Sequence, residues 1–204
     1  MVCLLVLFNT DSQADQKLHP LENYSVTYEL RGNSSGTKIL ASRDYGRKQC
    51  SIEKSEMEVM GNKTKKNDKI IIMAEDGEQW IITINLNENT GTKMKNPMFK
   101  TLADSMKEKS PKEFSESVMK QMGGEKKGQK TVNGETCTEW TMMAGAYACV
   151  TDDQILLESG ANIANISLSE VATDVKRNDP GPKGICDIGS AKIETIDLGQ
   201  MMGQ

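Results

Sequence analysis

Short runs in which apolar and polar residues alternate constrain this chain most. The stretch YSVTYEL, residues 24–30, places its four large apolar side chains on one face of an extended strand, and EQWIITINLNE, residues 78–88, does the same. Turns rich in Gly, Asn and Asp, such as EDGE at 75–78, separate the runs. This pattern predicts an antiparallel sheet built from hairpins. Further strands are expected at 37–46, 50–62, 68–76, 130–143, 147–153, 154–159 and 164–178.

The last of these strands changes phase along its length. Ile166 and Leu168 have one parity, whereas Val171 and Val175 have the other. A change of phase within one strand predicts a β-bulge, here near Glu170. The tail that follows is rich in Gly and Pro and is expected to form a loop. Residues 191–198, AKIETIDL, suit either a last strand or a short helix.

Two segments in the middle of the chain have helical rather than alternating periodicity. NPMFKTLADSMKEK (96–109) has apolar residues at four-residue spacing, with Asn96 as the expected N-cap and Pro97 at the first helical position. SPKEFSESVMKQMGG (110–124) begins with the spacing of a capping box, Ser110 followed by Glu113. Each amphipathic helix needs an apolar surface to cover, so both are expected on the apolar side of the sheet.

The first residues, MVCLLVLFNTDSQA, are typical of a secretory signal peptide. Residues 2–8 are continuously apolar, and SQA ends in a small residue before a polar sequence. We therefore expect cleavage near Ala14 and a periplasmic or extracellular mature protein. The alternative is a buried N-terminal strand. No apolar stretch approaches the length of a transmembrane span. With 204 residues, the chain suits one β-rich domain over residues 15–204, with a helical insert at about 96–124.

Removal of the predicted signal peptide leaves four cysteines. Cys137 and Cys149 are twelve residues apart on two predicted neighbouring strands, which suits a disulfide across a hairpin. The remaining pair, Cys50 and Cys186, would then tie the first part of the sheet to the tail. The sequence spacing alone leaves three pairings open. The alternative is four buried free thiols in a cytoplasmic chain.

The residues that usually carry catalysis or hold a cofactor are sparse. The chain has a single histidine, His19, which stands beside Pro20 in a segment expected to be irregular, and neither GxSxG, GxGxxG, HExxH nor a P-loop occurs. The cysteines lack the close spacing of zinc ligands. A net charge of −4 without a basic face argues against nucleic acid as a partner. We therefore expect no enzyme activity, no metal and no cofactor.

Two blocks of sequence carry a resemblance to a known family. YELRGNSSGTKILASRDYGRKQCSIEKSEMEVMG (28–61) resembles the opening of uncharacterised secreted bacterial proteins with a G-x-x-x-G-T…Y-G-R pattern. The later VNGETCTEWTM…ACVTDDQILLES…EVATDVKRN resembles the second half of the same proteins, with EVAT where E-A-T is usual. The arrangement, over roughly residues 24–178, is similar to the periplasmic lipoprotein-localisation-factor (LolA/LolB-like) superfamily.

That resemblance implies a mainly β (α+β) fold: an antiparallel curved sheet or half-barrel whose concave face is covered by the two short helices. It also implies a non-enzymatic carrier that binds a lipid or lipoprotein acyl chain in that face. Met side chains adapt to variable apolar ligands, but the helices would equally complete a closed core. The alternative function is a cell-envelope module with a filled core and a protein partner. The residues expected around a cavity are Tyr28, Tyr45, Trp80, Met98, Phe99, Leu102, Phe114 and Trp140.

Overall fold

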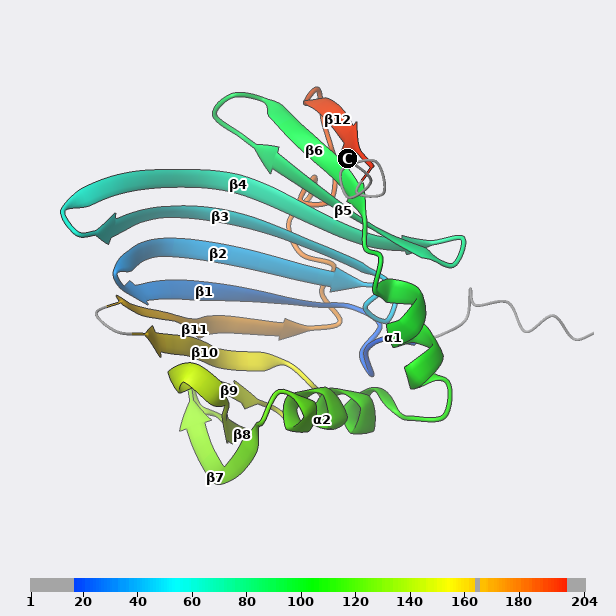
Figure 1. The fold of residues 1–204 in the computed structure, drawn as a ribbon, viewed down its shortest axis with the longest axis vertical. Helices are drawn as coiled ribbons and strands as arrows, with labels where there is room; N and C mark the ends of the chain where they lie inside the picture. Colours follow the sequence, from blue (N-terminus) through cyan, green and yellow to red (C-terminus); the bar gives the residue numbers. More distant parts are fainter. Residues whose placement is uncertain (1–16, 164–165, 198–204) are drawn as a thin grey trace, which may run out of the picture.

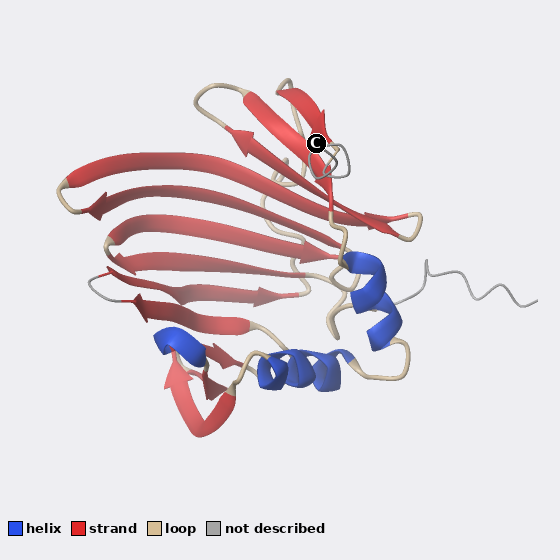
Figure 2. Cartoon of the chain, viewed as in Figure 1, coloured by secondary structure: helices blue, strands red, loops and turns tan. Residues whose placement is uncertain are grey.

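One curved sheet runs through the part of the chain that the computed structural model describes, residues 17–163 and 166–197. The predicted signal peptide, residues 1–14, lies outside the described residues. The sheet is open and mostly antiparallel (Figures 1 and 2). Its first half is a meander of six strands joined by tight turns. The alternating pattern predicted five of them, and the strand at 90–95 was not predicted. These are β1 (Tyr24–Gly32), β2 (Ser34–Arg43), β3 (Lys48–Val59), β4 (Asn62–Glu75), β5 (Glu78–Asn85) and β6 (Thr90–Lys95).

The second half starts with two helices and returns to the sheet on the other side of β1. The strand order is β12-β6-β5-β4-β3-β2-β1-β11-β10-β9-β8-β7, and only the β12–β6 pair is parallel among the described pairs. The tail segment 192–196 is therefore a strand rather than a helix. The remaining elements are α1 (Phe99–Met106), α2 (Pro111–Gln121), β7 (Glu125–Val132), β8 (Glu135–Thr141), the short 3₁₀ helix η2 (Met143–Gly145), β9 (Ala146–Val150), β10 (Leu156–Ile163), β11 (Ile166–Arg177) and β12 (Lys192–Ile196).

The two helices match their predicted positions, but one cap differs. Ser110 and Glu113 form the expected capping box at the start of α2, with Pro111 as the first helical residue. The prediction for α1 was wrong by two residues, because its N-cap is Met98 and no side chain caps it. Asn96 instead accepts a hydrogen bond from the backbone N–H of Met98 at 3.0 Å, which closes an Asx turn ahead of the helix.

The two faces of the sheet carry two separate cores. In β1, Tyr24, Val26 and Tyr28 point to one face and belong to the first core. In β2, Ala41 pairs with Ser25, so its side chain points to the opposite face. There it joins the second core, which includes Cys50, Ile71, Ile82 and Ile84. A sheet that buries apolar residues on both faces needs a cover on each.

The C-terminal segment covers the second core. Ile185 and Cys186 belong to that core, and both are buried. The ammonium group of Lys69 donates to the backbone carbonyls of Gly184 and Asp187, at 3.0 and 2.9 Å. In Figure 1 the segment between β11 and β12 passes behind the strands. We call this covered side the convex face and the side that faces the helices the concave face.

Both predicted disulfides are present. Cys137 and Cys149 join β8 to β9 with their Cα atoms 5.4 Å apart. Cys50 and Cys186 join β3 to the C-terminal segment with Cα atoms 5.3 Å apart. The second bond therefore fastens the cover of the convex face. Two disulfides fit a secreted or extracellular protein.

The predicted β-bulge exists, three residues further along than expected. Thr27 pairs with Asp174 and Tyr28 with Ala172, so the unpaired residue of β11 is Thr173 rather than one near Glu170. The bulge lets Ala172 and Val175 both face the first core, although their sequence parity differs.

Candidate functional site

The concave face carries a row of half-buried apolar side chains. Strand register places Ile72 beside Ile81, and Ile81 beside Met94. Leu40 and Ile70 lie on the same face, separated by Ser51 of β3. The five residues cross from β2 to β6, a span of four strand spacings or about 19 Å. We call them the apolar stripe: Leu40, Ile70, Ile72, Ile81 and Met94.

The stripe differs from the two cores in its burial. All five side chains are half-buried, whereas Ile71, Ile82 and Ile84 on the other face of the same strands are almost fully buried. The contrast arises because the C-terminal segment covers the convex face of β4 and β5. The stripe therefore keeps apolar surface in contact with solvent, next to a fully packed core.

Charged side chains border the stripe on the concave face. Lys38 is two residues from Leu40 in β2 and forms an ion pair with Glu170 at 2.7 Å, with side chains 23% and 17% exposed. Lys66 pairs with Glu53 at 3.0 Å. These groups make the concave face amphipathic, with an apolar stretch and a row of paired charges.

The helices lie on this same face. Trp140 of β8 shares a face with Tyr28, as the register through β9, β10 and β11 shows. It is buried next to Glu116 and Met119 of α2, around a cavity of only about 20 Å³. Helix α1 contacts β5 and α2 and buries Ala103 and Met106. Helix α2 thus covers the part of the concave face that β8 and β9 form.

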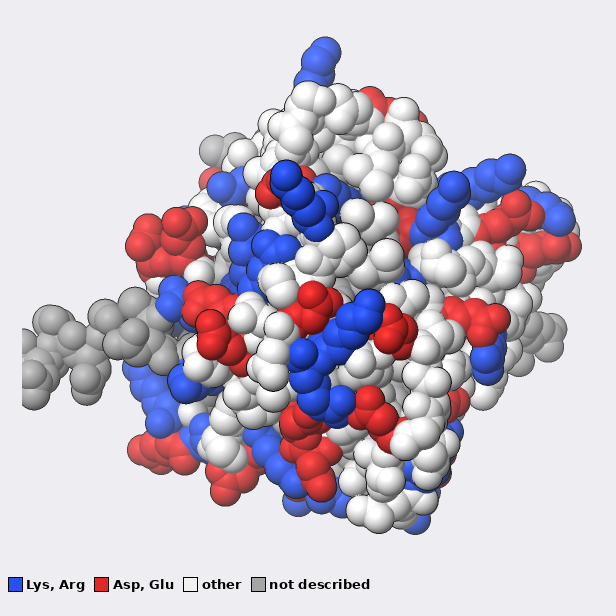
Figure 3. Space-filling model, turned by 180° about the vertical axis from the view of Figure 1, so that it is seen from behind, with Lys and Arg blue, Asp and Glu red and all other residues white. Residues whose placement is uncertain are grey.

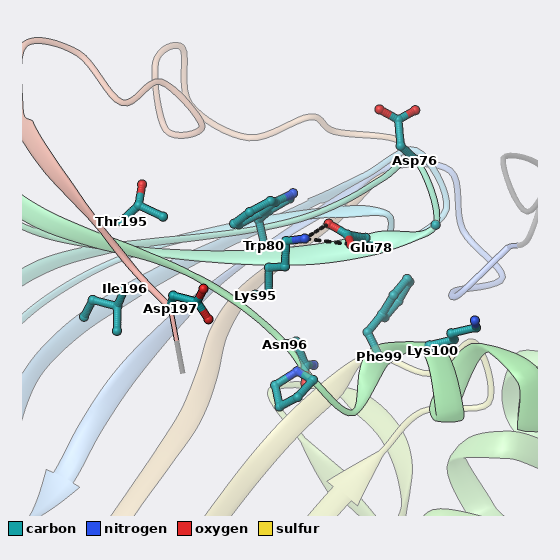
Figure 4. A pocket seen from close by; sticks show the side chains of 12 residues that line it. Asp76, Glu78, Trp80, Lys95, Asn96, Phe99, Lys100, Thr195, Ile196 and Asp197 are labelled. Carbon is teal, nitrogen blue, oxygen red and sulfur yellow. Dashed lines mark hydrogen bonds and ion pairs between the residues drawn. The ribbon is translucent and has the colours of Figure 1, made fainter. Parts of the chain in front are cut away.

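A larger cavity, of about 630 Å³, lies at the edge of the sheet near the start of α1. Figure 4 shows Trp80 and Phe99 at this cavity, with the Lys95–Glu78 ion pair between β6 and β5 beside them. The ammonium group of Lys93 is 4.2 Å from the centre of the Trp80 ring, so a cation occupies part of the aromatic surface. The cavity has mixed polarity. Its lining comprises Asp76, Gly77, Glu78, Trp80, Lys95, Asn96, Pro97, Phe99, Lys100, Thr195, Ile196 and Asp197.

Sequence reasoning missed a charged junction near the β9–β10 turn. Arg177 donates to Asp153 at 2.6 Å and to both oxygens of Glu135, at 2.6 and 3.1 Å. Burial by itself would raise the pKa of Asp153, but hydrogen bonds from Arg177 and Thr151 outweigh it, and the pKa is lowered. Three charges in salt-bridging geometry hold β8, β11 and the turn together, which is a structural role. The one sequence signal was the pair of acidic residues at 152–153.

The segment that holds His19, residues 17–23, contains no helix or strand, as the sequence predicted, but His19 itself is buried. Its ring is 4.5 Å from that of Tyr24, Nδ1 accepts from the backbone N–H of Leu21, and Nε2 lies 3.2 Å from the carbonyl of Gln154. Burial lowers the pKa of His19, with the backbone contacts opposing the shift. Burial also raises the pKa of Tyr24 to about 12. The two rings lie against each other inside a packed junction, and neither residue lines the edge cavity.

The structure brings only some of the predicted ligand residues together. Trp80 and Phe99 line the edge cavity. Trp80 is on the convex face, because it pairs with Met73 and shares the parity of Ile82, whereas Tyr28 is buried in the first core on the concave face. These two aromatic residues therefore do not border one cavity.

The other predicted residues are spread around the helices and the first turns. Met98, the N-cap of α1, is 59% exposed, Leu102 of α1 is 37% exposed, and Phe114 of α2 is half-buried. Tyr45 lies in the β2–β3 turn, where its carbonyl accepts from the N–H groups of Leu18 and His19. Its ring is 3.9 Å from the ammonium group of Lys17, so it anchors the N-terminal segment.

Three other kinds of site were sought in the described residues: a metal site, a membrane-spanning helix and a face that attracts polyanions. Within residues 17–163 and 166–197, no three His, Cys, Asp or Glu side chains are placed to hold a metal ion. None of the helices described there is long and apolar enough to cross a membrane. On the face seen in Figure 3, acidic and basic side chains are interspersed. Such a face creates no single-sign field to attract a polyanion.

Comparison with known proteins extends only to the fold. Neither a protein-family model nor a curated protein matches the chain. An uncharacterised conserved protein from Thermus thermophilus is similar in structure, with a TM-score of 0.55 and 7% identity, over 90% of this chain and 95% of that one. PNGF-II is similar over 89% of this chain but only 33% of its own length, with a TM-score of 0.52 and 12% identity. At such low identity, the likeness concerns the fold alone.

Proposed function

We propose that this protein is a non-enzymatic carrier of an apolar ligand, such as a lipid or a lipoprotein acyl chain, in an oxidising compartment outside the cytoplasm. The observation that carries the proposal is the apolar stripe on the concave face. An acyl chain laid across Leu40, Ile70, Ile72, Ile81 and Met94 would remove apolar surface from water on both partners. The stripe, at about 19 Å, exceeds the roughly 15 Å thickness of one leaflet of a bilayer's hydrocarbon core.

The charges beside the stripe suit the polar end of such a ligand. The ammonium group of Lys38 lies at the border, paired with Glu170, and a ligand carboxylate or phosphate would compete for it. The resemblance of its sequence motifs to the LolA/LolB-like superfamily supports the same class of ligand. The two disulfides support a compartment outside the cytoplasm.

Native mass spectrometry of the protein purified from a periplasmic fraction is the first test. A bound mass in the range of a fatty acid or phospholipid, released on denaturation, is the expected result. A clean apo mass together with no binding of a monomeric fluorescent fatty acid would contradict the proposal. That outcome would favour an envelope interaction module with a protein partner.

A substitution on the stripe locates the site. We expect Ile72→Asp to weaken binding of the fluorescent fatty acid about tenfold, because it places a charge against the acyl chain. Ile188→Asp is the matched control, since Ile188 is 39% exposed on the segment that covers the convex face. Equal loss in both variants would contradict binding on the concave face.

A further inference from the structure

The end of the sheet opposite α1 exposes large apolar side chains on several turns. Met60 at the β3–β4 turn is 93% exposed, Met143 of η2 70%, Ile163 at the end of β10 56%, and Met57 near the end of β3 38%. We call these four residues the apolar rim. In Figure 1 the β1–β2 and β3–β4 turns, the end of β10 and η2 all lie at the left end, and α1 lies at the right.

Hydrogen bonds hold the turns of the rim side by side. Asn33, in the β1–β2 turn, bonds the β3–β4 hairpin: its carbonyl accepts from Glu58 at 2.8 Å and its side chain donates to the Glu58 carbonyl at 3.1 Å. On its other side, Asn33 exchanges two bonds of 2.7 Å with Ser167 of β11. Ala146, directly after η2, pairs with Ala161 of β10. The rim therefore presents its side chains from one connected platform.

Met60 stands at a position that favours a different residue. It begins a two-residue hairpin turn, Met60–Gly61, and both residues have positive φ, 52° and 79°. This turn prefers Asn or Asp followed by Gly. The chain meets that preference in its other turns of this geometry, Asp76–Gly77 and Asn133–Gly134. A methionine in the left-handed conformation is a local cost, and such costs concentrate where a side chain serves a function.

We propose that the apolar rim docks the protein on the surface of a lipid bilayer by inserting these side chains between head groups. A lipid carrier has to meet the bilayer that supplies its ligand, so the choice of partner rests on the proposed function. None of the four rim residues is aromatic or Arg, the residue types that dominate protein–protein hot spots. Flexible Met side chains on separate turns instead suit a fluid surface.

Two lysines beside Met60 are also compatible with a lipid bilayer as the partner. Lys63 and Lys65 follow Met60 in β4, with side chains 61% and 82% exposed. Their pairs with Glu56 and Glu58 span 3.5–4.0 Å, a weak surface interaction. Long Lys side chains can keep their ammonium groups at phosphate level while the neighbouring turn enters the head-group region. Four separate side chains support reversible docking rather than permanent anchoring.

Vesicle flotation of the purified protein tests the proposal. The wild type is expected to float with phosphatidylcholine vesicles. Met60→Asp/Met143→Asp/Ile163→Asp should lower the vesicle-bound to free ratio about tenfold or more. Met60→Asp and Ile188→Asp form a matched pair, because each adds one negative charge at an exposed site. Met60→Asp should weaken flotation, whereas Ile188→Asp, which lies outside the rim, should change it by less than about twofold.

Met60→Asn separates docking from folding. Asn suits the turn better than Met, so the melting temperature should hold or rise while vesicle binding falls. No flotation of the wild type, equal loss in Met60→Asp and Ile188→Asp, or rim-dependent self-association without vesicle binding would each overturn the proposal. Uptake of a monomeric fatty acid in vesicle-free buffer reports the carrier function separately, and the rim variants should retain it.

Discussion

At the scale of single residues, His19 shows how burial decides the role of a titratable group. Its Nδ1 accepts from Leu21, so that nitrogen carries no proton, and Nε2 carries the proton toward the Gln154 carbonyl. The neutral ring fits the junction, and the imidazolium would lose the bond to Leu21. The only histidine of the chain therefore has a packing role in this junction.

This burial predicts a pH dependence of stability. The folded-state pKa of His19 is lowered, so the folded protein binds fewer protons there than the unfolded chain. The stability that His19 contributes is therefore fully present above its unfolded-state pKa of about 6.5. It is lost as the pH falls through the lowered folded-state pKa. Urea unfolding at pH 7.5 and 5.0 should show a larger loss of stability in the wild type than in His19→Gln. Parallel losses in the two proteins would contradict the role given to His19.

At the scale of elements, the start of α2 depends on its capping box. The Ser110 hydroxyl accepts from the Glu113 N–H at 3.3 Å, and the Glu113 carboxylate accepts from the Ser110 N–H at 2.8 Å. The Ser110 backbone bond lowers the pKa of Glu113. Because α2 lies over Trp140, the cap also helps to hold α2 over the concave face of β8 and β9.

We expect Ser110→Ala to destabilise the protein by about 1 kcal/mol, the usual cost of losing an N-cap. Faster hydrogen exchange at the first amides of α2 should accompany the loss. Ser105→Ala is the control, because that hydroxyl only donates to the carbonyl of Leu102 within α1. Its effect should stay within about 0.5 kcal/mol. A similar loss in both variants would mean that the cap does not govern α2.

At the scale of the whole molecule, the two disulfides close loops of very different size. Cys50 and Cys186 are 136 residues apart in sequence, whereas Cys137 and Cys149 are 12 apart. In the chain-entropy account, the longer loop stabilises by about 5 kcal/mol and the shorter by about 3 kcal/mol. The longer link also fastens the cover of the convex face, so its loss exposes the second core.

Cys50→Ala/Cys186→Ala should therefore lose more stability than Cys137→Ala/Cys149→Ala in denaturant unfolding. It should also show increased protease access to the segment between β11 and β12. A larger loss from the hairpin disulfide, or continued protection of that segment in the first variant, would contradict the assignment of the Cys50–Cys186 bond to the cover.

The sequence alone determined most of the strands and the position of the helices, and hairpin geometry favoured the Cys137–Cys149 bond. It predicted one strand at 130–143, where the structure has the β7–β8 hairpin, and it predicted no strand at 90–95, where β6 lies. Alternation identifies which residues of one strand share a face, and it did so for Tyr24, Val26 and Tyr28. It does not relate the faces of distant strands. Each two-residue turn reverses the parity that points to a given face, and a one-residue shift of register moves every side chain to the other side. Only the tertiary structure therefore placed Tyr28 and Trp80 on opposite faces.

The candidate site also could not be predicted, because alternation within one strand does not show which faces distant strands share. The residues of the apolar stripe come from four strands of the meander, β2, β4, β5 and β6, and have different parities, so no single run of sequence shows them as a group. Their half-burial depends on the C-terminal segment covering the other face, and that segment follows β6 only after both helices and five further strands. Local alternation fixes which side chains share a strand face, because it follows from backbone geometry. Which face stays open depends on where distant segments pack, and that is decided by the fold as a whole.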